Sequence, residues 1–491
     1  MKILFFYKEQ ENLGIQYLSS ILKKAGHEVS LIFDTGFDSY MGFYDIKALK
    51  GKKKEGKLIS KIKEINPDLF AFSCVTPLYS YVKETSSLVK KHFDIPVIAG
   101  GIHPTSVPEH VLKHPDIDMV YIGEGEEGVP ELIDRMARKE DISNVRNLWL
   151  KKDGVIIKNP LRPLIADLDP IPFPDRDLFY HHTFAGILTV ITGRGCPYRC
   201  TFCFNNQMER IYGIDEKHLR RRSIANVMEE LVYFKKKYKV RKVFFADDIF
   251  TLNSKWVGEF CEEYKRKVNV PFLCQVHPST LTPEVVKIMK EASCECVIYG
   301  LDSGNDYVRN KIMKKNVSRE KILETVNMIR GSGIKLFMNV IYGMVGEDIS
   351  HMQDTLNFLK QSRCDGVNAS IFYPYPETEA CEFGIKNGYI DEEIMENIRE
   401  GKSSTHGSSI INIKNKDFSE TIRNITPAYN KFPFLRPLFD LVIRKKWVKL
   451  SKMLYVFTGP FVYSTWGEIM FREMFFIFFR SFFTKKESSR S

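Results

Sequence analysis

The sequence predicts an α/β protein with a doubly wound parallel sheet, a second set of β/α units and a mainly helical C-terminal region. Two observations support this prediction. Short apolar runs alternate with helical stretches in two parts of the chain, and a proline-rich segment separates those parts. The chain has 491 residues, 44% hydrophobic and 27% charged, which is enough for two or three globular domains and excludes a disordered or polytopic membrane protein.

The first alternation occupies residues 1–140. Its expected strands are Ile3–Tyr7, Val29–Phe33, Leu69–Val75, Val97–Ala99 and Met119–Ile122, with a helix at Ile15–Ala25. Apolar strands separated by helices favour a parallel sheet with helices on both faces, which is a Rossmann-like arrangement. Because no G-x-G-x-x-G motif follows the first strand, a dinucleotide site is not expected.

Residues 141–185 are predicted to be a linker, because Asp169–Asp175 carries prolines at a spacing that excludes a helix or a central strand. Six further β-then-α units follow in residues 186–400. Their strands are expected at Ile187–Thr192, Lys242–Ala246, Phe272–Val276, Cys296–Leu301, Lys335–Ile341 and Gly366–Tyr373. Six units predict a partial, TIM-like (β/α)6 barrel with its site in the loops at the carboxyl ends of the strands.

Residues 401–491 are predicted to form a separate basic and aromatic region. Between Lys431 and Lys486 there are eleven Lys or Arg residues and three Asp or Glu residues, a net charge of +8. The apolar run Phe471–Phe483 is too short and too charged to span a bilayer. Peripheral contact with an anionic membrane and helices packed on the barrel both remain open. A nucleic-acid surface is not expected, because the apolar density exceeds what base stacking needs.

The chain does not begin with a charged segment, an apolar run and a cleavage site, so we expect a cytoplasmic protein, with membrane association left open. Ten cysteines in such a protein are thiols or metal ligands rather than disulfides. Seven are scattered, mostly in apolar runs, and are expected to be buried. Only three cysteines cluster, and they therefore point to a metal site.

Cys196, Cys200 and Cys203 form a C-x3-C-x2-C motif directly after the first barrel strand, in a loop that begins with two glycines. Three thiolates on a 4Fe-4S cluster leave one iron open for an outside ligand. A closed zinc site is the alternative, but it needs a fourth ligand, and the nearby histidines are poorly spaced for that role. The motif therefore favours an iron–sulfur cluster.

This motif, its flanking glycine and the aromatic Phe202 before the last cysteine resemble the radical S-adenosylmethionine superfamily. The resemblance implies that the open iron chelates S-adenosylmethionine, which an electron then cleaves to a 5′-deoxyadenosyl radical. It also implies that Phe202 lines the S-adenosylmethionine site and that an electron donor such as ferredoxin or flavodoxin is a partner. The hard chemistry belongs to the cofactor, and the protein orients and shields it.

Three later strand ends resemble the segments that hold the rest of S-adenosylmethionine in this superfamily. Asp247 and Asp248 end the second strand and are expected to meet the ammonium group, with a helix N-cap as the alternative. Asp302-Ser303 ends the fourth strand, and Gly343 lies in a glycine-rich segment expected near adenine. His277 stands where relatives tend to place an arginine, so a guanidinium contact to the carboxylate is not assumed.

Loops of residues 1–140 carry glycines and polar residues at the edge where open α/β sheets bind ligands. They resemble the cobalamin-binding domain that precedes many radical S-adenosylmethionine barrels. The resemblance implies that cobalamin contacts Gly14, Ser73, Thr76, Gly100, Gly101, His103, Thr105, Gly123, Glu124 and Gly125. The Asp-x-His-x-x-Gly motif is absent and His103 is the only histidine in a suitable loop, so we expect water or no lower ligand on cobalt.

The leading hypothesis is a cobalamin-dependent methyltransferase that abstracts hydrogen from an unactivated carbon. A radical cyclase or rearrangement enzyme without methyl transfer is the alternative. A non-catalytic corrinoid- or metal-binding module is the third candidate, and the intact cysteine triad argues against it. The expected substrate is a small molecule or a lipid, which the sequence does not name.

Overall fold

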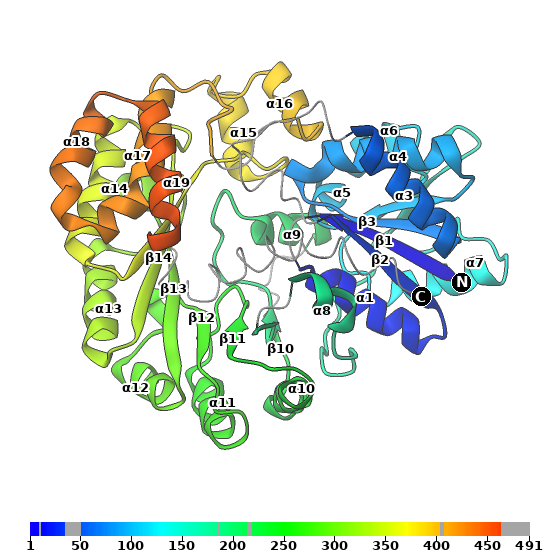
Figure 1. Cartoon of the computed structure of the whole chain (residues 1–491), viewed down its shortest axis with the longest axis horizontal. Coiled ribbons are helices and arrows are strands. Elements are labelled where there is room, and N and C mark those ends of the chain that lie inside the picture. Colours follow the sequence, from blue (N-terminus) through cyan, green and yellow to red (C-terminus); the bar gives the residue numbers. More distant parts are fainter. Residues whose placement is uncertain (9–10, 35–50, 184–185, 214–218, 403–406, 463–491) are drawn as a thin grey trace. The chain divides into compact units, whose positions relative to one another are not determined.

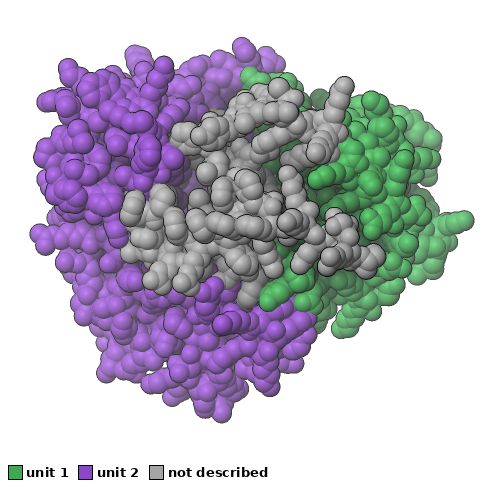
Figure 2. Space-filling view, viewed as in Figure 1, with its two compact units in different colours: residues 1–166, 170–184, 395–403 green, residues 167–169, 185–394, 404–491 purple. Residues whose placement is uncertain are grey.

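The computed structural model describes residues 1–8, 11–34, 51–183, 186–213, 219–402 and 407–462 (Figure 1). The chain forms two compact units, coloured separately in Figure 2. The first consists of residues 1–166, 170–184 and 395–403, and the second of residues 167–169, 185–394 and 404–491. Most of the predicted linker thus belongs to the first unit, as does a short segment from the end of the predicted barrel.

The first unit is built on a seven-stranded sheet of order β2-β1-β3-β4-β5-β6-β7. Its parallel strands are β1 (Lys2–Lys8), β2 (Glu28–Asp34), β3 (Leu69–Ser73), β4 (Val97–Gly100) and β5 (Met119–Tyr121). These segments are strands because their apolar, largely β-branched or aromatic residues are buried. The strand order reverses between β1 and β3, and a crevice outside the carboxyl ends of the strands is where doubly wound sheets bind ligands.

The predicted linker contains two strands that the sequence analysis missed, β6 (Leu148–Lys152) and β7 (Val155–Lys158). They form an antiparallel hairpin that extends the sheet beyond β5. Asp153 and Gly154 connect them, both with positive φ, which is the backbone that a tight two-residue hairpin turn requires. The Asp-Gly pair between apolar residues was the available signal.

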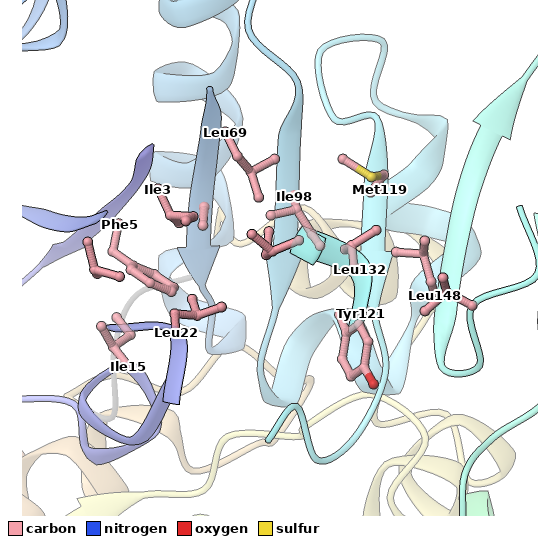
Figure 3. Packing of buried hydrophobic residues seen from close by; sticks show 14 of the residues in the cluster. Ile3, Phe5, Ile15, Leu22, Leu69, Ile98, Met119, Tyr121, Leu132 and Leu148 are labelled. Carbon is pink, nitrogen blue, oxygen red and sulfur yellow. The ribbon is translucent and has the colours of Figure 1, made fainter. Parts of the chain in front are cut away.

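Helices pack on both faces of this sheet. They are α1 (Leu13–Lys24), α3 (Gly51–Ile65), α4 (Tyr79–His92), α5 (Ile102–Ser106), α6 (Pro108–Lys113), α7 (Gly128–Ala137) and α8 (Asp177–Thr183). Asn12 caps α1 by accepting a hydrogen bond from the Ile15 backbone N–H at 2.9 Å. Figure 3 shows the resulting core, in which Ile15 and Leu22 of α1 pack with Phe5 of β1.

The second unit contains six parallel strands in the order β15-β14-β13-β12-β11-β8. They are β8 (Ile187–Val190), β11 (Lys242–Phe245), β12 (Phe272–Gln275), β13 (Cys294–Asp302), β14 (Lys335–Tyr342) and β15 (Gly366–Ile371). The helices between and after these strands are α9 (Phe204–Tyr212), α10 (Ile224–Lys237), α11 (Ser254–Lys267), α12 (Pro283–Glu291), α13 (Arg319–Ser332), α14 (Ile349–Ser362) and α15 (Glu379–Lys386). The next helix, α16 (Glu392–Arg399), begins in this unit and belongs to the first unit from Met395 on. The prediction of six parallel β/α units is confirmed.

Three C-terminal helices, α17 (Lys416–Lys431), α18 (Arg436–Arg444) and α19 (Val448–Val462), complete the described part of this unit (Figure 1). Helix α17 covers the edge of the sheet at β15. There Arg423 Nε donates to the Ala369 carbonyl at 3.0 Å, and Asn430 Nδ2 donates to the Cys364 carbonyl at 3.0 Å. Side chains of α17 thus bind one backbone carbonyl in β15 and one just before it, at the edge of the described sheet.

None of the described helices is long and apolar enough to cross a membrane. The run Phe471–Phe483, singled out in the sequence, lies outside the described residues.

Candidate functional site

The cysteine loop begins where β8 ends. A two-residue ribbon, β9 (Gly193–Arg194), pairs with β10 (Arg220–Arg221) and leads into the loop. Cys196, Cys200 and Cys203 are partly exposed, whereas the seven other cysteines are buried, as predicted. The Cys203 backbone N–H donates to the Cys200 carbonyl at 3.1 Å, and α9 begins directly after Cys203. The accessible thiols of the second unit are therefore gathered at one strand end.

The three cysteines supply soft sulfur ligands in one loop. Among the described residues, the set of three metal-ligating side chains whose ligand atoms all lie within 4.8 Å of one another is His110, Glu396 and Glu400, and it contains no cysteine. A closed zinc site would need a fourth protein ligand beside the cysteines. Three thiolates instead suit a 4Fe-4S cluster that keeps one iron open.

Burial raises the pKa of Cys196 to about 12 and that of Cys200 to about 11. Burial also raises the pKa of Cys203. Without a metal these side chains are therefore thiols, and they lose their protons when they bind iron. Smaller contributions to the pKa of Cys196 and Cys203 come from the charge of Asp248, which places that carboxylate beside both cysteines.

Asp247 supports the start of the cysteine loop. It is 2% exposed, and its Oδ1 accepts from the Thr192 and Gly193 backbone N–H groups at 2.7 and 2.6 Å. Its Oδ2 accepts from Thr192 Oγ1 at 2.7 Å. Burial raises the pKa of Asp247, and the nearby Arg221 and these three donors oppose that rise. Both oxygens are occupied inside the protein, so we assign Asp247 to the loop instead of to an ammonium group.

The neighbouring Asp248 has a different environment. Asp248 is exposed to solvent, yet the protein around its carboxyl group raises its pKa, and a hydrogen bond accepted from the Asn205 side chain opposes that rise. Of the acidic pair at the end of β11, this carboxylate is the one open to a cationic ligand beside the cysteines. Phe202 is partly buried in the same loop.

Asp302 forms a buried ion pair with Lys315, a residue that the sequence analysis did not single out. Lys315 Nζ also donates to the Gly300 carbonyl. Burial alone would lower the pKa of Lys315, but the charge of Asp302 holds it well above its usual range. Asp302 itself has φ 58° at a break in the β13 register, so its backbone is strained.

A polar layer lies next to this ion pair. The rings of Tyr198 and His277 stack with centroids 3.9 Å apart, and Tyr299 meets His277 edge-on at 6.2 Å. Within the described residues, the buried His277 Nε2 and Tyr299 hydroxyl have no hydrogen-bond partner. Burial and the Lys315 charge lower the pKa of His277 to about 3, so this ring is neutral.

The remaining predicted residues of this unit are buried within its packing. Ser303 is fully buried, and its Oγ bonds Thr355 Oγ1 at 3.3 Å and accepts from the Asn305 backbone N–H. Gly343 has φ 73°, and its N–H donates to Glu347 Oε2 at 2.7 Å. Burial raises the pKa of Glu347 to about 8 against two backbone hydrogen bonds that lower it. These residues shape loops at the barrel's strand ends.

The predicted ligand loops of the first unit are tied together by hydrogen bonds. Asn12 Nδ2 donates to Ser73 Oγ at 3.3 Å, and the Gly123 N–H donates to Thr105 Oγ1 at 3.0 Å. The residues of this set that are at least partly exposed are Gly14, Ser73, Gly100, Gly101, Gly123, Glu124 and Gly125. They belong to loops at the carboxyl ends of the strands, as expected.

Gly101 and Gly100 differ in how much space they have. Gly101 has φ 98°, and a Cβ there would lie 2.8 Å from the Cys74 backbone nitrogen. Gly100 has no positive φ, and the nearest atom to its added Cβ is 3.7 Å away. The backbone conformation therefore requires glycine at position 101. At position 100 the protein itself leaves room for a side chain, so close approach of a ligand to the backbone would account for the glycine there.

His103 is fully buried, with Nδ1 3.2 Å from Thr76 Oγ1 and its ring centroid 4.5 Å from that of Tyr79. Burial lowers its pKa to about 3. The ring is therefore packed inside the first unit, and its contact with cobalamin stays a prediction. Thr76 and Thr105 are buried too and hold the loops from within.

Residues 395–403 pack on the same region of the first unit, which the sequence did not reveal. Glu400 forms ion pairs with Lys83 and, at 3.0 Å, with His110 Nε2. A Cβ on Gly401 would lie 2.9 Å from the Thr76 carbonyl oxygen. This segment therefore packs closely against the loop after β3.

Two family models match the chain. The radical SAM superfamily model matches residues 190–359, and the B12 binding domain model matches residues 6–133. The first match contains all three clustered cysteines, and the second contains the loops of the doubly wound sheet.

The chain is 28% identical over 388 residues to an uncharacterised methyltransferase of Pyrococcus horikoshii, covering 77% of this chain and 79% of that protein. It is 24% identical over 422 residues to the anaerobic magnesium-protoporphyrin IX monomethyl ester cyclase of Rubrivivax gelatinosus, covering 80% and 72%. The cobalamin-dependent S-adenosylmethionine radical enzyme OxsB with aqua-cobalamin bound has a TM-score of 0.67 at 16% identity, covering 94% of this chain and 73% of that chain. That structural likeness shows a shared fold.

Proposed function

Since the chain belongs to the radical S-adenosylmethionine superfamily and carries a B12-binding domain, we propose that it methylates an unactivated carbon of a small molecule or lipid. The observation that carries this proposal is the pairing, in one chain, of an accessible cysteine triad with a doubly wound domain whose ligand-edge loops carry glycines. The similarity to a methyltransferase over most of both chains supports the same reaction.

The cofactors are a 4Fe-4S cluster, S-adenosylmethionine and cobalamin. Together they supply a 5′-deoxyadenosyl radical and a methyl group for transfer. The three cysteines fit the cluster, because they are partly exposed thiols gathered in one loop and leave one iron of the cluster open. The partly exposed glycine loops fit a large planar ligand that must approach the backbone closely.

The protein's own residues position these groups. Asp247 fixes Thr192 and Gly193 at the start of the cysteine loop. Asp248 offers an exposed carboxylate beside Cys196 and Cys203, which suits the ammonium group of S-adenosylmethionine. The Lys315 ammonium group, held by Asp302, keeps a buried positive charge near Cys200, where it lowers that thiol's pKa against the larger effect of burial.

A radical cyclase without methyl transfer is the second candidate, because the chain is also similar to a cyclase over most of its length. The two reactions consume S-adenosylmethionine differently. Methylation uses one molecule as methyl donor, giving S-adenosylhomocysteine, and a second as radical source, giving methionine and 5′-deoxyadenosine. Cyclisation gives no S-adenosylhomocysteine.

The test compares extracts of a gene-deletion strain and its parent to find a compound that differs by one CH2 group, and then supplies the unmethylated form to the reconstituted protein. Methylation predicts S-adenosylhomocysteine, 5′-deoxyadenosine and methylated product in equal amounts. A Cys196→Ala variant is the matched control and should form none of the three. Product formation without S-adenosylhomocysteine would contradict methylation and support cyclisation or rearrangement.

A further inference from the structure

The outer faces of α18 and α19 combine positive charge with exposed apolar side chains. From Lys431 to Phe457 the chain has seven Lys or Arg residues and one acidic residue, Asp440. Five of the basic side chains are exposed: Arg444, Lys445, Lys446, Lys449 and Lys452. This is a stretch of concentrated positive charge within the second unit.

Helix α19 presents one exposed stripe, in which only Lys452 has an ion-pair partner among the described residues, Glu420 at 3.5 Å. Its exposed residues are Lys449, Lys452, Met453, Val456 and Phe457, at the i, i+3, i+4, i+7 and i+8 spacing of a single helix face. The other side of the helix packs on α17, where the buried Ser451 accepts from Asn424 Nδ2 at 3.1 Å. The helix is thus held on the protein by one side while its other side is amphipathic.

The exposure of the apolar residues is large. Phe457 is 69% exposed, Trp447 directly before α19 is 45% exposed, and Phe434, in the turn before α18, is 77% exposed. Isolated exposed apolar residues are common on soluble proteins, but here aromatic rings recur beside a run of lysines. Tryptophan, phenylalanine and lysine side chains together are the composition that favours a membrane–water interface.

Three kinds of partner could bind such a surface, and its combination of lysines with exposed apolar side chains favours one of them. A nucleic acid would use the lysines and stack on the rings, but it gains nothing from Met453 and Val456. A protein partner would need acidic groups opposite each of the exposed lysines. An anionic lipid surface satisfies both halves of the pattern at once, since its phosphates meet the lysines and its acyl chains meet the apolar stripe.

We propose that α18 and α19 form a docking surface for anionic membranes. The helices lie in the interface, since no described helix is long and apolar enough to cross a bilayer. Trp447 and Phe457 enter the headgroup region, and Lys445, Lys446 and Lys449 contact lipid phosphates. The docking does not depend on methylation, and its test does not use enzyme activity.

The charge contribution is measured by sedimentation of the full-length protein with vesicles of phosphatidylcholine alone or mixed with phosphatidylglycerol. We expect binding only to the mixed vesicles, weakened by salt. Replacing Lys445, Lys446 and Lys449 with Gln should lower the partition coefficient at low salt on the order of a hundredfold. Replacing the exposed Lys57, Lys61 and Lys63 of α3 removes the same charge from the first unit and should change it less than threefold.

The apolar contribution is measured through Trp447 fluorescence. On binding mixed vesicles, the emission of Trp447 should shift to the blue and be quenched by brominated lipid, and Trp447→Phe should remove both signals. Phe457→Ser should lower the partition coefficient about tenfold, whereas Phe383→Ser, at a 44% exposed position on α15, should leave it unchanged.

Three results would overturn the proposal. The first is no sedimentation with mixed vesicles at low salt. The second is an equal loss of binding in the α3 and α18–α19 variants, which would indicate a nonspecific effect of net charge. The third is complete loss of binding in a chain that ends at Val462, because the membrane contact would then belong to residues 463–491. Retained binding in that shortened chain supports the proposal.

Discussion

The two substitutions Asp247→Ala and Asp247→Asn should have very different effects. In the structure, Asp247 Oδ1 accepts both backbone bonds, from Thr192 and Gly193, while Oδ2 accepts only the Thr192 hydroxyl. Alanine removes both acceptor oxygens and all three hydrogen bonds, and it leaves two N–H groups without a partner. Asparagine keeps Oδ1 and presents an amide nitrogen to a hydroxyl that can turn to accept from it.

The magnitude follows from these contacts. Hydrogen bonds to a charged group contribute about 1.5–3 kcal/mol each, and removing one partner of a buried charged pair costs about 3–5 kcal/mol. Asp247 is a buried charge near Arg221, so we expect Asp247→Ala to destabilise the loop by about 3–5 kcal/mol. Asp247→Asn should cost less, about 1–2 kcal/mol, because it keeps both backbone bonds and loses only the negative charge near Arg221.

Hydrogen exchange measured by mass spectrometry on peptides covering Thr192 and Gly193 reports this difference locally. Since about 1.4 kcal/mol corresponds to a factor of ten, Asp247→Ala should speed exchange there at least a hundredfold and lower the iron content after reconstitution. Asp247→Asn should keep slow exchange, iron and reductive cleavage of S-adenosylmethionine.

The neighbouring Asp248→Asn is the matched control. Its side chain is exposed, so the variant should leave exchange at Thr192 and Gly193 unchanged and raise the KM for S-adenosylmethionine about tenfold. Our assignment of Asp247 fails if Asp247→Asn abolishes binding of S-adenosylmethionine with exchange unaltered, since that pattern means direct contact. It also fails if Asp247→Ala leaves exchange and iron content at wild-type values.

Three further predictions follow from the same structure. Replacing Cys196, Cys200 and Cys203 with Ala should abolish the visible absorbance of the anaerobically reconstituted protein, whereas Cys74→Ala, at a buried thiol, should keep it; iron and sulfide retained in the triple variant would exclude the assigned ligands. Gly101→Ala should destabilise the first unit by about 1–3 kcal/mol even without cobalamin. Gly100→Val should keep the fold but weaken cobalamin binding. If Gly100→Val binds cobalamin as tightly as wild type in a titration, the loop at Gly100 is not part of the cobalamin site. Burial raises the pKa of Glu347 in the folded state to about 8, above the usual 4.5, so the stability linked to its proton is present at low pH and is lost as the pH rises from 4.5 to 8. Glu347→Gln should therefore become more stable relative to wild type over that range. If the urea midpoints of the two proteins instead change in parallel with pH, the carboxyl is not protonated in the fold.

The parallel sheets could be predicted from the sequence, because buried parallel strands are almost continuously apolar, whereas the helices between them mix apolar and polar residues. The sequence was also sufficient for the cysteine triad, since the ligand spacing lies within eight consecutive residues. The β6–β7 hairpin was missed although Asp153-Gly154 is a strong turn signal. The proline-rich stretch that follows dominated the interpretation of the whole segment.

Residues 395–403 could not have been assigned from the sequence. Their place in the first unit depends on contacts with residues about three hundred positions earlier, such as the Glu400 ion pairs with Lys83 and His110. Helix periodicity reports which face of a segment is buried, but not against which partner. The same limit applies to α17, whose Arg423 and Asn430 resemble surface residues until their bonds to the edge of β15 are known.

The predicted site residues show why a strand end is easier to predict than the role of its side chains. Asp247 and Asp248 are adjacent in the loop after β11, which ends at Phe245, yet their side chains have different surroundings. Asp247 is buried and accepts hydrogen bonds at the start of the cysteine loop, whereas Asp248 is exposed. Lys315 was missed for the converse reason. It lies after an irregular helical turn, with no motif around it, and only the fold brings its ammonium group to Asp302. A buried cation is destabilising unless a charge of opposite sign is paired with it, so Asp302 and the buried Lys315 must be kept together.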